Sequence, residues 1–334
     1  MTKAVLIGIL LFTCGAVSAQ KLDRKAQIET MYRLIDEYSP TISYMIKTSA
    51  SLPRNYRIAG MRVSAGRHQP PETWLSGNTE SKLVDNLSMV AHESAHGFQF
   101  IYPFNVLQAS SPEDFKLGDY TAYFLDSART YVVKHTVCFN SNELKNEIPK
   151  DLKTYRYTPY IAPKSGIGSQ KEGFYGLLGE FNAYYIGMLM THDMFAYYET
   201  QAAEDLEAYQ KYIQNISSDV AAFYEFKYFL LQYLLKAKLD YPNQYELLMD
   251  NTLLRIAYTQ VYTAFENLVK TYDKQLLALE TKISNLGIAV NIDDEYFWVD
   301  GYGVGLNLQT INPMKTELAK PVYEEVHQAF IYQK

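Results

Sequence analysis

The sequence predicts a mainly α protein with a smaller β component, the α+β class. Over most of the 334 residues, apolar side chains recur at the three- and four-residue spacing that places them on one face of a helix. Glycine and proline, which interrupt helices, number only 17 and 12. The two-residue alternation of strands is confined to short segments. These observations favour a helical protein with small sheets attached.

The expected helices follow from this spacing in chain order. The first covers residues 22–49 and breaks where Ser39 precedes Pro40, because the residue before a proline disfavours the helical conformation. The later helices are expected at about 81–100, about 120–135, 172–200 and, as two or three long pieces, 203–286.

Two segments are expected to form β-structure. Residues 56–63 alternate along a stretch that is bounded by glycine and proline, which is typical of a strand. Near the C-terminus, residues 295–308 contain two strand-like runs separated by Asp300-Gly301. Because Asp-Gly accepts the positive φ angles of a tight turn, this segment is predicted to be a β-hairpin.

Residues 1–19 have the features of a cleavable signal peptide. Lys3 precedes an apolar run that is too short to span a bilayer, and Val17-Ser18-Ala19 offers small or compact side chains to a signal peptidase. We therefore expect a secreted or periplasmic protein whose mature chain has no membrane span. The mature chain is expected to consist of a core over 20–200 and a helical C-terminal region over 201–334 that carries the hairpin.

Composition excludes several classes of function. The chain has 31 Lys and Arg against 37 Asp and Glu, a net charge of −6, whereas a nucleic-acid-binding protein normally carries a basic excess. Two cysteines are too few for a disulfide framework, an iron–sulfur site or a multi-cysteine zinc ribbon. The 30 tyrosines have amphipathic side chains, which are compatible with solvent-filled grooves lined by aromatic rings as well as with a hydrophobic core. No nucleic-acid partner is expected.

A motif with the spacing of metal-binding residues lies in the helix expected at about 81–100. There His92-Glu93-Ser94-Ala95-His96 matches the pattern H-E-x-x-H, whose two imidazoles lie one turn apart on one face of a helix. Two nitrogens in this arrangement can bind one metal ion, and imidazole is a ligand that zinc favours. Glu93 lies about 100° round the helix from His92, so it can face a water on the metal without becoming a ligand. The motif predicts a Zn²⁺ site.

This motif resembles the active-site helix of the zincin metallopeptidases, which share the motif, a zinc ion and a cleft between two subdomains. The metzincin branch carries a further histidine where this chain has Tyr102. The resemblance is therefore to the gluzincin branch, in which a glutamate from a downstream helix is the third ligand. It implies a zincin-like catalytic core over residues 20–200, with a motif helix and a small β-sheet.

Glu180 is the third ligand that the resemblance implies. It stands early in an apolar, aromatic helix, where a buried carboxylate would need a partner such as a metal ion. The alternative is a Glu180 that faces solvent near the helix N-terminus. Glu172, Asp193 and Asp126 remain alternative ligands, and Asp193 could instead orient a ligand histidine.

The zincin resemblance also implies a mechanism. Zinc held by His92, His96 and Glu180 would lower the pKa of a bound water towards about 7. Glu93 would act as the general base and would then pass the proton to the leaving amine.

The oxyanion of this reaction needs a hydrogen-bond donor, which in zincins is commonly a tyrosine or a histidine. Tyr184 and Tyr185, soon after the implied third ligand, are the preferred candidates. The other candidates are Tyr157, Tyr160, Tyr175 and His192. Zincins commonly bind the substrate as an added strand, and residues 57–64 are expected to be either the edge for that strand or an ordinary loop.

Three functions remain open at this point. The leading hypothesis is an exported zinc-dependent metallopeptidase that acts on a peptide or protein substrate. The second is a non-catalytic, exported helical binding protein for a protein or glycan, in which the metal is structural or absent. The third is a zinc hydrolase that acts on another acyl group. The sequence does not define an oligomeric state.

Overall fold

The computed structural model describes residues 21–66, 69–162, 167–201 and 206–332. The expected signal peptide, residues 1–19, lies outside the described residues. Within them the chain is predominantly helical and carries three small antiparallel sheets, which confirms the predicted mainly α, α+β class.

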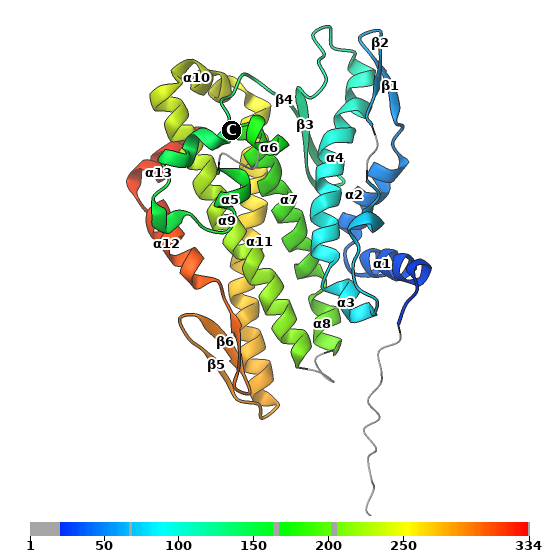
Figure 1. The fold of residues 1–334 in the computed structure, drawn as a ribbon, viewed down its shortest axis with the longest axis vertical. Coiled ribbons are helices and arrows are strands. Elements are labelled where there is room, and N and C mark those ends of the chain that lie inside the picture. Colours follow the sequence, from blue (N-terminus) through cyan, green and yellow to red (C-terminus); the bar gives the residue numbers. More distant parts are fainter. Residues whose placement is uncertain (1–20, 67–68, 163–166, 202–205, 333–334) are drawn as a thin grey trace, which may run out of the picture.

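Long helices run side by side along the longest axis of the molecule (Figure 1). They are α4 (Leu87–Ser110), α7 (Phe174–Asp193), α9 (Glu207–Asp240) and α11 (Thr252–Asn285). Helix α7 packs against α4 on one side and against α9 and α11 on the other. Sixteen of its 20 residues are buried, because nearly every face of the helix carries apolar or small side chains. The hydrophobic core therefore follows α7.

The N-terminal helices pack beside α4. Helices α1 (Arg24–Tyr38) and α2 (Pro40–Ser51) meet at the predicted break, and Pro40 occupies the first turn of α2, where its missing N–H has no cost. The helix expected at about 81–100 is divided into α3 (Glu80–Val84) and the longer α4. Between them, the side chain of Asn86 accepts a hydrogen bond from the backbone of Ser76.

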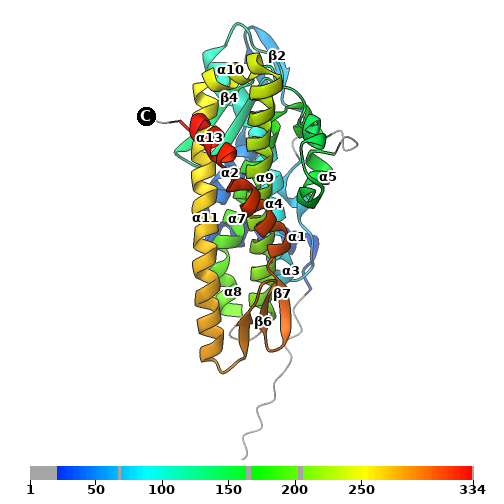
Figure 2. The ribbon, with the colours of Figure 1, turned by 90° about the vertical axis from the view of Figure 1, so that its left-hand side faces the viewer.

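Shorter elements complete the helical part. In Figure 2, α12 (Leu308–Leu318) and α13 (Pro321–Phe330) lie across the pair formed by α9 and α11, and both pack against α9. The short α-helices are α5 (Tyr157–Tyr160), α6 (Gly168–Lys171), α8 (Phe195–Gln201), α10 (Pro242–Asp250), α12 (Leu308–Leu318) and α13 (Pro321–Phe330). The 3₁₀ helices are η1 (Pro71–Trp74), η2 (Ser141–Asn146) and η3 (Lys150–Leu152).

The segment expected to be one strand at 56–63 is a hairpin. Strand β1 (Asn55–Ile58) pairs antiparallel with β2 (Met61–Ser64), and Tyr56 lies opposite Val63. The chain turns at Ala59 and Gly60, whose φ angles are 49° and 78°. Positive φ at both central residues is the geometry of a tight hairpin turn.

The prediction of a helix at about 120–135 is wrong. This segment forms the hairpin of β3 (Tyr120–Asp126) and β4 (Arg129–Lys134). Its threonine, valine and aromatic side chains favour strands. The Asp126 carboxylate accepts hydrogen bonds from the backbone N–H groups of Ala128 and Arg129, which fixes the turn.

The hairpin predicted near residues 295–308 is present. Strands β6 (Tyr296–Val299) and β7 (Tyr302–Gly305) pair antiparallel, and β5 (Val290–Ile292) adds a third strand. The turn lies at Asp300 and Gly301, with φ angles of 49° and 82°. This sheet lies at one end of the long helices (Figure 1).

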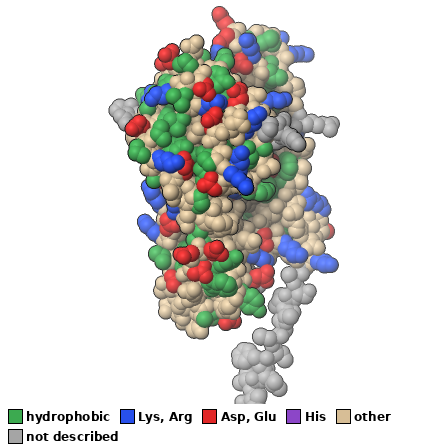
Figure 3. Space-filling model, turned by 60° about the vertical axis from the view of Figure 1, so that its left-hand side comes forward, with side chains coloured by type: hydrophobic (Ala, Val, Ile, Leu, Met, Phe, Trp, Pro, Cys, Tyr) green, Lys and Arg blue, Asp and Glu red, His purple; other side chains and the backbone are tan. Residues whose placement is uncertain are grey.

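The surface carries charges of both signs. On the face shown in Figure 3, acidic and basic side chains lie interspersed over the described residues. Each helix in the described part of the chain is too short or too polar to cross a lipid bilayer.

Candidate metal centre

Three side chains converge where α4 packs against α7. His92 and His96 lie one turn apart on α4, as the H-E-x-x-H spacing predicts, and Glu180 reaches them from α7. The Nε2 atoms of the imidazoles are 3.1 Å apart, and Glu180 Oε2 lies 3.2 Å from His96 Nε2 and 3.8 Å from His92 Nε2. One ligand atom from each residue lies within 4.8 Å of the others. The group could hold a metal ion.

Two glycines of α7 allow the helices to approach this closely. A Cβ atom at Gly187 would lie 3.1 Å from Ser88 Oγ and 3.7 Å from His92 Cβ, and one at Gly179 would lie 3.3 Å from Gln99 Oε1. Because protein interiors are close-packed, a larger side chain at either position would crowd Ser88 or Gln99. The two glycines therefore leave room for the close packing of α7 against α4.

The charges of the three side chains are coupled. Burial, together with the neighbouring positive charge on His96, lowers the pKa of His92 to about 3. Burial opposes protonation of His96 as well, but the adjacent Glu180 carboxylate outweighs it and raises that pKa to about 9. For Glu180, burial is outweighed by the imidazolium of His96, and the pKa is lowered. A metal ion would replace the proton on His96.

The donor set fits a metal cation. Glu180 is only 7% exposed, and its Oε2 atom makes ion-pair contacts but no well-aligned hydrogen bond within the described residues. A buried carboxylate oxygen needs a positive partner, and either the imidazolium of His96 or a bound metal ion can be that partner. Two imidazole nitrogens and one carboxylate oxygen are ligands of the kind that zinc takes.

Hydrogen bonds behind the imidazoles fix their orientation. The backbone carbonyl of Ala183 accepts a hydrogen bond from the His92 ring. His96 Nδ1 lies 3.1 Å from Gln99 Oε1, and because an amide oxygen only accepts, Nδ1 carries the proton. The Gln99 amide nitrogen donates in turn to the Gly179 carbonyl at 2.8 Å. Both histidines thus present Nε2 to the centre.

Replacing Gln99 with leucine is expected to weaken metal binding about 10- to 100-fold, because an outer hydrogen-bond partner of a ligand histidine is lost. Competition with a metal-binding indicator dye measures the affinity. Gln108→Leu, at an exposed position of the same helix, is the matched control and should bind metal like the wild type. Equal affinity of Gln99→Leu and Gln108→Leu would contradict this role of Gln99.

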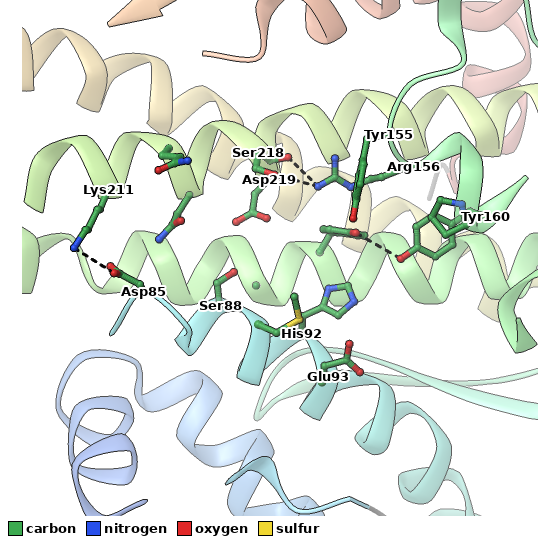
Figure 4. A pocket seen from close by; sticks show the side chains of 16 residues that line it. Asp85, Ser88, His92, Glu93, Tyr155, Arg156, Tyr160, Lys211, Ser218 and Asp219 are labelled. Atoms are coloured by element: carbon green, nitrogen blue, oxygen red, sulfur yellow. Dashed lines mark hydrogen bonds and ion pairs between the residues drawn. The ribbon is translucent and has the colours of Figure 1, made fainter. Parts of the chain in front are cut away.

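Glu93 lines two cavities beside the cluster. The larger, of about 800 Å³, also contains His92 and Tyr184. The other, of about 590 Å³, contains His96 and Ser64, the last residue of β2. Burial raises the pKa of Glu93, and the nearby His96 opposes this shift. Figure 4 shows His92 and Glu93 along the α4 side of the larger cavity.

Of the two tyrosines that the sequence favours, the structure brings Tyr184 to the cluster. Its ring meets the His92 ring edge-to-face, with centroids 4.5 Å apart. Its hydroxyl lies 3.5 Å from that of Tyr160, and either hydroxyl can be the donor in this contact.

Tyr185 lies elsewhere. It follows Tyr184 on α7, so it points about 100° away round the helix, and its ring packs against Phe265 with centroids 6.1 Å apart. Burial raises the pKa of its hydroxyl to about 12. The structure does not bring Tyr185 to the metal cluster.

The alternative ligands also lie outside the three-residue group among the described residues. Asp126 pairs with Arg129 in the turn of β3 and β4, at 2.5 Å. Asp193 accepts a hydrogen bond from Ser39 at 2.5 Å. Glu172 lines a third cavity, of about 200 Å³, together with His96 and Glu180. The other candidate donors also bond elsewhere: Tyr157 to Lys145, Tyr175 to Thr136 and Asn251, and His192 to Asp193.

A buried ion pair contacts the ring of Tyr184. The Arg156 guanidinium lies over the Tyr184 ring, 4.5 Å from its centroid. Arg156 Nη1 donates to Glu225 Oε2 at 2.6 Å, and the two side chains are 7% and 0% exposed. Thr154 also donates to the Glu225 carboxylate. The sequence analysis did not find this pair, whose members lie far apart in the chain.

Comparisons with protein-family models, curated proteins and solved structures found no match for this chain. The functional inference therefore rests on the geometry and chemistry of the metal cluster and its cavities.

Proposed function

We propose that the chain is an exported zinc-dependent metallopeptidase of the gluzincin type. The observation that carries the proposal is the convergence of His92, His96 and Glu180 beside Glu93 at a cleft. Catalytic zinc sites typically use three protein ligands and keep a fourth position open, whereas structural sites close it with a fourth ligand. The three-residue group has the catalytic composition.

The residues around the cluster support this proposal by their positions. A bound zinc ion would supply Lewis acidity and a more acidic water. Glu93, which lines both cavities, would accept a proton from that water and pass it to the leaving amine. Tyr184 would donate its hydroxyl proton in a hydrogen bond to the developing oxyanion. Tyr160 and Arg156 would hold that hydroxyl in place.

The position of β2 supports an extended peptide as the substrate. The cavity that contains Ser64, at the end of β2, is also lined by Glu93, and among the described strands β2 pairs with β1 alone. A peptide would add as a strand along its second edge, a common mode of peptide recognition. This arrangement favours a peptide substrate over a small acyl compound.

Replacing Tyr184 with phenylalanine is expected to lower kcat about 10²- to 10³-fold, the effect of removing one oxyanion donor, with little change in KM. Tyr185→Phe is the matched control, because it removes a neighbouring hydroxyl that lies away from the cavity. Steady-state kinetics on a fluorogenic peptide measures both. A fall in rate of the same size in Tyr185→Phe would contradict the assignment.

The proposed function is tested with an internally quenched peptide library and the zinc-loaded protein. We expect cleavage, loss of cleavage after the metal is removed with a chelator, and recovery when zinc is restored. A protein that holds zinc but cleaves no member of the library would contradict the proposal and would favour a binding protein with a structural metal.

A further inference from the structure

The larger cavity has a polar wall that the proposed mechanism does not use. Five residues of α9 that line it follow the helical spacing i, i+3, i+4, i+7 and i+8. They are Lys211, Gln214, Asn215, Ser218 and Asp219. Figure 4 shows Ser218 and Asp219 on the α9 side of the cavity, across from Ser88 and His92 on α4.

Asp219 is the unusual member of this wall. It is only 7% exposed, and its Oδ2 atom has no hydrogen-bond partner in the described part of the chain. Burial raises the pKa of Asp219 to about 7, and the positive charge of Arg156 only partly offsets this. A buried carboxylate without a partner is costly, so its retention in a cavity wall points to a ligand.

The cations beside the cavity already have anionic partners. Arg156 is paired with Glu225 at 2.6 Å, and its second guanidinium nitrogen donates to the backbone oxygen of Ser218 at 3.2 Å. Lys211 Nζ lies 3.5 Å from Asp85 Oδ2 and 3.3 Å from the carboxylate of Glu207.

The remaining titratable groups that line the cavity are Glu93, His92, Tyr155, Tyr160 and Tyr184. Among the groups that line the cavity, Asp219 thus remains the buried carboxylate without a hydrogen-bonded partner.

We propose that Asp219 binds a cationic group, namely the ammonium or guanidinium of a lysine or arginine side chain in the substrate. Glu93 and His92 line the same cavity, so a residue next to the scissile bond can direct a long side chain towards Asp219. Its aliphatic stem would lie along Met89, Tyr184 and the other apolar lining, while its charged end meets the carboxylate. The substrate assignment rests on the proposed peptidase function, whereas the cation site does not.

The cation site is tested with butylguanidine and with butylurea, its uncharged counterpart of nearly the same shape. By calorimetric titration of the full chain, we expect butylguanidine to bind at least tenfold more tightly. Asp219→Asn should abolish that preference. Asp240→Asn, at the end of the same helix in a surface pair with Lys236, should retain it. Equal binding of the two probes to the wild type, or an unchanged preference in Asp219→Asn, would overturn the proposal.

The substrate assignment is tested with N-acetylated peptides that carry arginine, lysine or citrulline, since blocking the amine leaves the side chain as the added charge. The wild type should cleave the arginine and lysine peptides at least tenfold faster than the citrulline peptide, and Asp219→Asn should cleave all three similarly. Cleavage without a charge preference would overturn the substrate assignment. If no peptide is cleaved while butylguanidine still binds preferentially, the peptidase proposal fails and the cation site stands.

Discussion

Replacing Glu93 with glutamine is expected to lower kcat about 10²- to 10⁴-fold while the protein keeps its full metal content. The amide cannot accept a proton, so general-base catalysis is lost. Glu93 is not part of the three-residue ligand group, so all three ligands remain in Glu93→Gln. Peptide hydrolysis and elemental analysis on one preparation measure both quantities.

Two further variants make this result specific. Glu113→Gln, at an exposed position after α4, should retain wild-type activity. Glu180→Gln should lose activity together with metal, because it removes a ligand carboxylate. If Glu93→Gln lost metal as Glu180→Gln does, Glu93 would be a ligand and not a base. Wild-type activity in Glu93→Gln would place the base elsewhere.

Replacing Glu225 with glutamine is expected to lower the free energy of unfolding by about 3–5 kcal/mol, because it leaves the Arg156 guanidinium buried without its counter-charge. The pair is almost fully excluded from solvent, which makes the loss much larger than for a surface pair. Urea unfolding of the metal-loaded protein, followed by circular dichroism, measures the change.

The matched controls test whether the loss of stability comes from the burial of this ion pair or from the loss of any ion pair. Glu37→Gln breaks an exposed pair with Arg33 at 3.3 Å and should cost less than about 1 kcal/mol. The double variant Arg156→Met with Glu225→Leu should recover part of the loss, because apolar side chains can replace a buried ion pair while Thr154 loses its acceptor. A loss below about 1 kcal/mol in Glu225→Gln would show that water reaches Arg156.

Local sequence pattern was sufficient to predict most helices and insufficient for two hairpins. Period-3.6 spacing in long segments, as in α9 and α11, has few alternative explanations. Residues 120–135 were too short a segment to separate helix from strand by spacing, and their β-branched and aromatic side chains carried the better signal. The turn at Ala59 and Gly60 was missed because alanine is unusual at positive φ.

Likewise, only part of the candidate site could be predicted from local sequence spacing. His92 and His96 could be predicted because helix geometry alone brings them together. Gln99 is three residues from His96 on the same helix, so a search for partners at that spacing could have found it. Arg156 and Asp219 depend on how α7 and α9 pack around the cavity, and no local spacing encodes that packing. Residues on both sides of position 200 line one cavity, so the site needs both predicted parts of the chain.

The most direct test of the metal site is the zinc content of the purified protein, measured by elemental analysis after zinc has been offered and the excess removed. We expect about one zinc per chain in the wild type and in Glu93→Gln, and almost none in His92→Ala or His96→Ala. Absence of bound zinc in a folded wild-type protein, or equal zinc in the wild type and His92→Ala, would contradict the proposed catalytic centre.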